Sequence, residues 1–567
     1  MAAAAHGQFV PPAPVHDRPV PLPRLDQQWI RAVSPNFRVV STASQQRTRQ
    51  ITETLETVAG ALRRVHPRFD ARFADTTVFV FDRRRDSQPY FELLLNQPRT
   101  STPGAFVVNS DGTAAIVIDS TRPLSTDRTV KHELMHNILA TSGTRLPLWL
   151  EEGIAEYFST TIVRGESVII GRPILSHQRL LRARGGLAVE DLLSARTGAP
   201  IASNPLFYPQ SWALVEWMMR TNRSAFYAFV ADVEKGEDTA EAFQRHFSME
   251  IATVARSFRL FSIRPSASST VRIQRAAVPV TIATISAADV LQELAQFLGR
   301  INTTRDDAEG YLRAALESDP DHALSVATLG TLRAWDRKFA EAEAYFEEAL
   351  RIDPDNPAIL TAFAEALLQN SIGPFAGVTT LDHDAPARFR RARELIQTAL
   401  EKETTPIALA ILGTTYLTEA DPSKGIEPLQ KACAARPARL DFALNLYALY
   451  LRTEQGDEAE QLFEAVFART ENAQAESAAR AVYVREQIDR ANRFADLECY
   501  DDAADIVKRV IELTPDPAAR AELVREVGKL RQVAEVNRQI MTYNEAVAAY
   551  NQKELQTALE RLDFLLT

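Results

Sequence analysis

Cysteine is almost missing from this chain, which has only Cys433 and Cys499 among its 567 residues. Two cysteines cannot form the set of bridges that stabilises small secreted domains, so the fold has to rely on hydrophobic cores. Both cysteines lie in segments with helical periodicity, where cysteine commonly packs as a small apolar residue. The sequence therefore excludes a disulfide-rich scaffold, and its cysteines do not identify the compartment.

Long apolar runs are also missing, since none approaches the roughly 20 residues that span a bilayer. This excludes an integral membrane protein. The first residues lack the cationic and apolar segments of an export signal and lead into a stretch rich in proline. A cytoplasmic protein is the default expectation, and an exported or periplasmic form would require a trimmed N-terminus.

A dominant charge of either sign is missing as well. The chain has 64 Lys and Arg against 74 Asp and Glu, a formal net charge of -10, and its basic residues are dispersed. We therefore expect no nucleic-acid partner. What is present, 46% hydrophobic and 24% charged residues, is typical of a soluble globular protein with about three or four folding units.

Composition and periodicity divide the chain into four parts. Residues 1–34, rich in Pro and Ala, are predicted to be a disordered lead-in. Residues 35–263 combine short strands with helices, which predicts an α+β domain with a small sheet followed by a helical region. Residues 264–285 lack helical periodicity and are interpreted as a linker or a crossing strand. Residues 286–567 contain repeated helical pairs.

The repeat signature is clearest around Leu329. Leu329-Gly330, Ala342, Phe346 and Pro354 fit the pattern of the tetratricopeptide repeat, whose unit has 34 residues. The same pattern returns between residues 412 and 437. Small residues recur because two helices approach closely there, and Pro ends the second helix of each unit. This predicts an α-solenoid over residues 286–567, with a groove that binds a protein partner or substrate.

A second motif carries chemistry. His132-Glu133-Leu134-Met135-His136 lies in a predicted helix, where residues four apart share a face. One Zn²⁺ ion can therefore meet both imidazoles, and Glu133 can accept a proton from a water that the metal activates. The alternative is a pair of core or surface histidines. A third zinc ligand is expected from the next predicted helix, which offers Glu151, Glu152 and Glu156.

The segment around these acids resembles a known family. Its Trp-Leu-x-Glu-Gly-x-Ala pattern is similar to the third-ligand helix of aminopeptidase N relatives, and an acid four residues later resembles thermolysin. With the histidine motif, it resembles the gluzincin metallopeptidases, and more narrowly the peptidase-MA-like domains that are joined to tetratricopeptide repeats. The resemblance implies Glu152 as the third ligand and Glu156 as a hydrogen-bond partner of a ligand histidine. Glu156 is the alternative ligand, and Glu151 is expected to point elsewhere.

Two more segments carry the same resemblance. Tyr208 precedes an apolar helix, as does the tyrosine that donates to the oxyanion in the aminopeptidases, although it could instead cap a core helix. Gly104, Ala105 and Phe106 resemble the strand that lies beside the substrate, which reads Gly-Ala-Met-Glu-Asn in aminopeptidases. The acid of that pattern is missing here. Without it, an endopeptidase or an unusual specificity is favoured over an aminopeptidase.

The sequence thus predicts a zinc-dependent peptidase with one Zn²⁺ per chain. Its ligands would be His132, His136 and Glu152, its general base Glu133, and its oxyanion donor Tyr208. One alternative is a weak or inactive metalloprotease-like scaffold for protein–protein interaction, and another is a hydrolase of a non-peptide amide. The intact Glu133 favours an enzyme, because loss of the base is the simplest route to an inactive relative.

Overall fold

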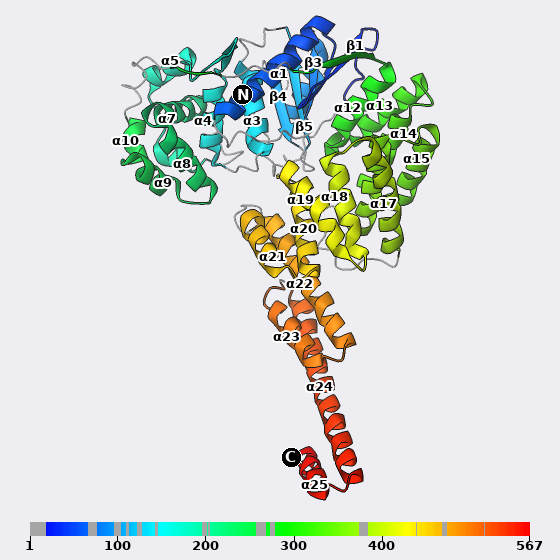
Figure 1. Cartoon of the computed structure of the whole chain (residues 1–567). Helices are drawn as coiled ribbons and strands as arrows, with labels where there is room; N and C mark the ends of the chain where they lie inside the picture. The colour runs from blue at the N-terminus through cyan, green and yellow to red at the C-terminus, as the bar shows by residue number, and fades with distance from the viewer. Residues whose placement is uncertain are drawn as a thin grey trace. The chain divides into compact units, whose positions relative to one another are not determined.

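A computed structural model describes most of the chain (Figure 1). The described residues are 19–65, 76–95, 104–108, 113–121, 128–141, 146–195, 201, 204–256, 268–272, 278–372, 384–437, 439–467, 473–514 and 516–566. The chain forms two compact units. The first consists of Met1–Ala366, Glu394–Ala408 and Lys431–Arg439, and the second of Leu367–Arg393, Leu409–Gln430 and Leu440–Thr567.

A six-stranded mixed sheet organises the first unit, with the strand order β4-β5-β3-β2-β1-β9. Strands β2, β3 and β5 run parallel, while β4 is antiparallel to β5, and β1 is antiparallel to both β2 and β9. The strands are β1 (Trp29–Val33), β2 (Phe37–Ser41), β3 (Thr76–Phe81), β4 (Gly104–Val108), β5 (Ala114–Asp119) and β9 (Thr281–Ile285).

Both faces of this sheet are buried, as expected for parallel strands that are covered by helices on two sides. Along β3, Val78 and Val80 face one hydrophobic core, and Phe79 and Phe81 face the other. The first core also contains residues of α1 (Gln45–Val65) and α3 (Arg128–Thr141). The second contains residues of α2 (Arg84–Leu95) and of the first repeat helices α12 (Ala287–Gly299) and α13 (Arg305–Ser318).

Two predicted boundaries are wrong. The lead-in predicted over residues 1–34 includes β1, an inner strand of the sheet; residues 1–18 lie outside the described part of the chain. The segment 264–285 contains two strands instead of a free linker, because β8 (Ser269–Arg272) pairs with β7 (Ser167–Ile170) and β9 pairs with β1. The crossing-strand interpretation of this segment is the one that holds.

The repeat array is joined to the sheet instead of being tethered beside it. Phe297 of α12 lies 5.4 Å from Phe79 between ring centroids. On β1, Arg31 contacts the carboxylates of Asp289 and Glu293 on α12, each at 3.1 Å. The sheet and the first repeat helices therefore share one core.

The helical region between the sheet and the array contains the predicted helices. The two that carry His132 and Glu152 are α3 and α4, and the apolar helix expected at Tyr208 is α7. The elements are α4 (Leu148–Phe158), β6 (Ile162–Arg164), β7, α5 (Leu175–Arg184), α6 (Val189–Leu193), α7 (Phe207–Thr221), α8 (Arg223–Glu234), α9 (Thr239–Phe247) and α10 (Ile251–Arg256).

The remainder of the chain is helical and arranged in pairs, as the repeat pattern predicts. Beyond α13 its helices are α14 (Ala323–Trp335), α15 (Phe339–Ile352), α16 (Pro357–Ile372), α17 (Ala385–Lys402), α18 (Pro406–Thr414), α19 (Ile426–Ala435), α20 (Leu440–Arg452), α21 (Gly456–Leu462), α22 (Ala473–Asp496), α23 (Tyr500–Val510), α24 (Pro517–Asn551) and α25 (Leu555–Leu566). Small residues mark close contacts: a Cβ on Gly413 would lie 2.6 Å from the carbonyl oxygen of Gly425. Among the described residues, no helix is both long and apolar enough to cross a membrane.

Candidate metal centre

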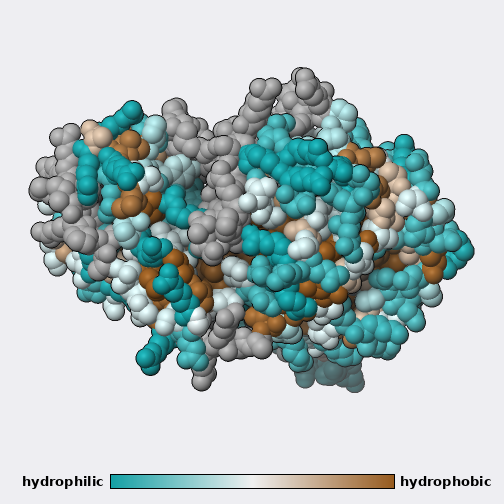
Figure 2. Space-filling model, turned by 90° about the horizontal axis from the view of Figure 1, so that it is seen from above, coloured by the Kyte–Doolittle hydropathy of each residue, from teal (hydrophilic) through white to brown (hydrophobic). Residues whose placement is uncertain are grey.

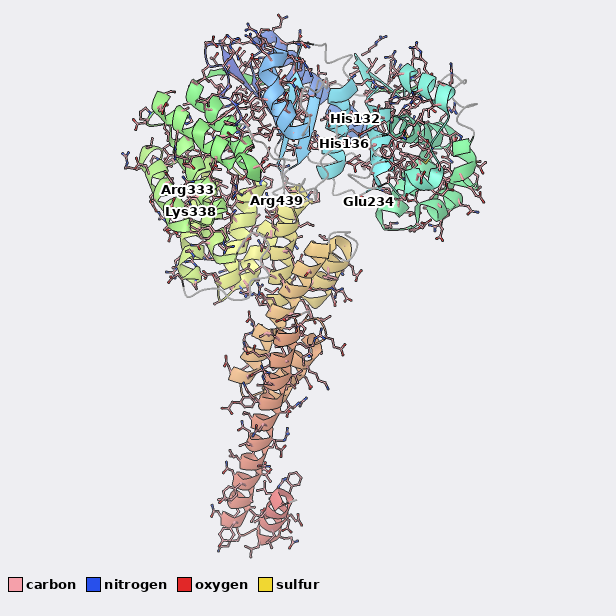
Figure 3. The ribbon with its side chains drawn as sticks, turned by 180° about the vertical axis from the view of Figure 1, so that it is seen from behind. His132, His136, Glu234, Arg333, Lys338 and Arg439 are labelled. Atoms are coloured by element: carbon pink, nitrogen blue, oxygen red, sulfur yellow. The ribbon has the colours of Figure 1, made fainter. Side chains whose placement is uncertain are left out.

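Three side chains converge between α3 and α4. The Nε2 atoms of His132 and His136 are 3.0 Å apart, and Oε2 of Glu152 lies 3.2 Å from the first and 3.5 Å from the second. In a tetrahedral zinc site with bonds of about 2.0–2.1 Å, ligand atoms are separated by roughly 3.3 Å. Figure 3 shows the two histidines side by side on their helix. Within the described ranges, no other group of His, Cys, Asp and Glu has this convergence.

Local packing aims these side chains at one another. On α3, Leu134, Met135 and Ile138 are buried in the first core, which turns the histidine face of the helix toward α4. On α4, Gly153 allows a close crossing with α7, because a Cβ there would lie 2.5 Å from the carbonyl oxygen of Ser211. The residue before it, Glu152, is thereby held on a helix that is fixed from its opposite side.

The site is deeply buried yet rich in charge. The side chains of His136 and Glu152 are each 2% exposed, and that of His132 is 11% exposed. Oε1 of Glu133 is buried without a hydrogen-bond partner, whereas Oε2 of Glu152 faces the Nε2 atoms of both histidines. A buried carboxylate oxygen without a partner is unfavourable, and a divalent cation would satisfy it. With two imidazoles and one carboxylate as donors, these residues fit Zn²⁺ and leave a fourth position open.

The electrostatics separate the two buried acids. Burial opposes ionisation of Glu152, but contacts with His136 and His132 outweigh it and lower the pKa of this carboxyl below its usual range. Burial likewise disfavours a charged His136, yet the Glu152 carboxylate raises the pKa of that imidazole well above its usual value. Burial raises the pKa of Glu133. Glu152 is thus favoured in the anionic form that binds metals, whereas Glu133 is favoured as a proton acceptor.

The outer partners of the histidines differ in part from the prediction. Glu151, expected to point elsewhere, lies with Oε1 at 3.1 Å from Nδ1 of His136, where the ring can donate to the carboxylate. Glu156, predicted to hydrogen-bond a ligand histidine, lies with Oε1 at 3.9 Å from Nδ1 of His132, which is beyond hydrogen-bond distance. The reason is the helical phase of α4, which brings Glu151 under His136 while Glu156 sits one turn further on.

One residue near the site was missed from the sequence. His177, on α5, lies with Nε2 at 3.4 Å from Oε2 of Glu156, and Arg128 approaches the same carboxylate at 3.7 Å. These contacts, with burial opposing them, lower the pKa of Glu156. No motif surrounds His177 in the sequence, so no local signal could have identified it.

Tyr208 lies at the start of α7, close to the cluster. Its ring centroid is 6.4 Å from that of His132. Burial and the charges of Glu152 and Glu133 raise the pKa of its hydroxyl. The tyrosine therefore stays protonated at neutral pH, so its hydroxyl can act as a hydrogen-bond donor.

The strand with Gly104, Ala105 and Phe106 lies beside α3, the helix that carries His132 and His136. It is β4, at one edge of the sheet, and it packs against α3. Phe106 is buried in the core that contains Leu134, whereas Ala105 faces the other core. Within the described residues, β4 pairs only with β5. Its second edge therefore carries backbone groups that could hydrogen-bond to another extended chain.

Comparisons with known proteins identify the repeats. A family described as tetratricopeptide repeat matches residues 336–370, and a protein family of unknown function, DUF1570, matches residues 127–237. His132, His136, Glu152 and Tyr208 all lie within the second stretch. No curated protein matches the chain significantly. The tetratricopeptide repeats indicate a role in protein–protein interaction.

Solved structures with similar helical arrays include a structure of PilF from Pseudomonas aeruginosa, with 20% identity, a TM-score of 0.30, and coverage of 42% of this chain and 97% of that chain. YrrB, described as a tetratricopeptide-repeat protein with an unusual peptide-binding site, has 16% identity, a TM-score of 0.26, and coverage of 38% and 97%. Human IFIT1 bound to m7Gppp-AAAA has 14% identity, a TM-score of 0.25, and coverage of 70% and 95%.

Proposed function

We propose that this protein is a zinc-dependent peptidase of the gluzincin kind, and that its repeats bind a protein substrate or partner. The observation that carries the proposal is the convergence of His132, His136 and Glu152 at ligand distances, next to Glu133, whose Oε1 is buried without a hydrogen-bond partner. When bound, zinc polarises a carbonyl and lowers the pKa of a water molecule. The sequence resemblance to gluzincins supports the same assignment.

The chain's own groups supply the remaining chemistry of amide hydrolysis. Glu133 accepts the proton of the attacking water and passes it to the amine that leaves, so that the water oxygen ends on the carbonyl carbon. Tyr208 donates a hydrogen bond to the oxyanion that develops on the former carbonyl oxygen. The edge of β4 that is unpaired among the described residues would hold an extended peptide by backbone hydrogen bonds.

An endopeptidase fits this arrangement better than an aminopeptidase. The strand offers no acid among Gly104, Ala105 and Phe106 to bind a free amino group, and backbone pairing along β4 does not require a chain end. A non-peptide amide as substrate has no specific feature in its favour.

The test combines metal analysis with a peptide-cleavage screen of the full chain. Wild-type protein should hold about one zinc per chain, and His136→Ala should lose most of it because the site loses one of its three ligands. Glu133→Gln should retain zinc and lose activity by roughly 10²–10⁴-fold, since an amide cannot accept the proton. Glu166→Gln, on an exposed turn, is the matched control and should behave as wild type.

The outcomes separate the enzyme from the scaffold. Zinc content that is unaffected in both His132→Ala and His136→Ala contradicts the metal site. If the wild-type protein binds zinc but shows no peptide cleavage that depends on Glu133, an inactive metalloprotease-like scaffold is favoured instead. Its function would be protein–protein interaction through the repeats.

A further inference from the structure

The last helix pair has an inverted distribution of apolar residues. Helix α24 buries three residues, all of them alanine: Ala534, Ala546 and Ala549. Eight of its large apolar side chains, between Val524 and Tyr550, are exposed instead. Figure 1 shows α25 folded back along the end of α24. Seen from above, in Figure 2, the hydrophobic residues of the molecule occur in separate patches among hydrophilic ones. A pair that buries alanine and exposes larger residues leaves its main apolar surface unused.

Six of the exposed apolar residues of α24 form a regular stripe. Their spacing is three, four, three, four and three residues, which is the heptad repeat of a coiled-coil seam. We call this set the heptad stripe: Val533, Val536, Ile540, Tyr543, Val547 and Tyr550, which are between 40% and 64% exposed. The first residue of each heptad, Val533, Ile540 or Val547, is β-branched, as is common at this position of two-stranded coiled coils.

The faces of α24 that meet its own chain lie elsewhere. Leu523, Val527 and Leu530 pack against α23. Arg531 and Arg538 form ion pairs with Asp501, also on α23. At 100° per residue, these contacts and the buried Ala534 and Ala549 fall on other sides of the helix than the heptad stripe, while the buried Ala546 borders it. The stripe is therefore not needed to hold α24 in place.

The positions that flank the stripe carry no charge. In a coiled coil these flanks select the partner, because like charges repel and opposite charges attract across the seam. Here the flanking residues are polar and neutral or small: Gln532, Asn537, Gln539, Asn544, Ala546 and Asn551. Two identical helices meet no electrostatic penalty at such flanks, whereas a strongly charged partner would gain nothing from them.

We propose that the heptad stripe of α24 is a self-association surface that pairs with the stripe of a second copy of this chain. If the six stripe residues lose roughly 100 Å² on average, about 600 Å² is buried per copy and ~1,200 Å² in all, at the lower end of the range for specific interfaces. The available surface is thus sufficient for a stable dimer.

The experiment measures the mass of the full chain in solution by sedimentation equilibrium, with a reductant present because Cys499 is exposed. Wild type should show twice its chain mass of 63.1 kDa. Ile540→Glu should raise the dissociation constant at least about tenfold, because pairing would bury a charge in an apolar seam. Met541→Glu is the matched control: Met541 is 64% exposed on the same turn but off the stripe, and this variant should remain a dimer.

A second stripe variant of opposite charge, Val536→Lys, should dissociate like Ile540→Glu, and all three variants should keep the wild-type circular dichroism. The proposal would be overturned if the wild-type mass stayed at 63.1 kDa at all concentrations up to about 100 μM. The dissociation constant would then exceed ~100 μM, which is higher than that of most specific dimers. Equal dissociation of Met541→Glu and Ile540→Glu, or a dimer that neither stripe variant weakens, would also overturn it.

Discussion

Glu151 and Glu152 are neighbours in the sequence, yet their carboxylates occupy different layers of the metal centre. Oε2 of Glu152 lies near the Nε2 atoms of both histidines, whereas Oε1 of Glu151 lies beside the other ring nitrogen of His136, Nδ1. A carboxylate at Nδ1 fixes the ring orientation and the tautomer that presents Nε2 to a metal. The pair therefore divides binding and positioning between adjacent side chains.

Replacing Glu151 by Ala should weaken zinc binding by about 10–100-fold without removing a ligand, because His136 loses the acceptor that orients it. Competition with a chelator of known zinc affinity measures the effect. Glu166→Ala, at an exposed position, is the control and should leave the affinity unchanged. Equal affinities for wild type and Glu151→Ala would show that the contact does not position the ring.

Asp289 predicts a pH-dependent contribution to stability at the start of α12. The nearby His322, whose Nε2 is 3.7 Å away, the hydrogen bonds from Ser286 and the charge of Arg31 lower the pKa of Asp289 against the opposing effect of burial. A lowered folded-state pKa stabilises the protein above the unfolded value of about 3.9, and this stabilisation is lost as the pH falls below it. Asp289→Asn should lower Tm by about 2–4 °C at pH 7.

The difference in Tm between wild type and Asp289→Asn should then shrink as the pH is lowered from 5 toward about 3.5, where Asp289 begins to protonate in the unfolded chain. Thermal melts monitored by circular dichroism at each pH provide the measurement. A difference that stays constant, or grows, over this range would show that the charge of Asp289 is not the stabilising feature.

At the scale of elements, the crossing of α4 and α7 determines where Glu152 and Tyr208 lie. Gly153→Ala should lower the free energy of unfolding by about 1–3 kcal/mol and weaken zinc binding, because its Cβ would meet the backbone of Ser211 and push α4 away from α7. Gly60→Ala is the control, since nothing lies within 4 Å of a Cβ there. Helix propensity should make it more stable by about 0.5–1 kcal/mol.

Chemical denaturation and zinc titration of both glycine variants give the two readouts. If Gly153→Ala were as stable as wild type, helix α4 would have room to move, and the close crossing would not hold Glu152.

The elements of this chain differ in how well its sequence predicts them. The helices that carry His132 and Glu152 follow from strong local periodicity, and the repeats follow from their recurring small residues. Strand β1 was missed because it is only five residues long, follows a proline-rich stretch, and is completed by a partner strand about 250 residues away. The contact of Glu151 was missed because it depends on how two helices are rotated against each other, which no local pattern encodes.

At the scale of the whole molecule, the first repeat helices belong to the sheet. Removing residues 286–567 would expose Phe79 and Phe81, which are at most 1% exposed in the intact chain, and would delete Phe297 and Tyr311 from their core. We expect this truncated protein to aggregate or to lack cooperative unfolding. A chain that ends at residue 402, after α17, retains this core and should unfold cooperatively.

Solubility, near-ultraviolet circular dichroism and zinc content of the two truncated proteins provide the measurements. A fragment of residues 1–285 that is soluble, unfolds cooperatively and binds zinc like the full chain would contradict the shared core and restore the picture of a tethered array.

The pairing of β1 with β9 also has a consequence for synthesis on the ribosome. Trp29 pairs with Ile285, so one edge of β1 has no partner until about 250 further residues have been translated, which takes roughly 10–50 s at 5–20 residues per second. During that interval the helices of the metal centre have already emerged, while the sheet beneath them still has an open strand edge. The sheet and the candidate metal centre therefore reach their final form only after the first repeat has left the ribosome.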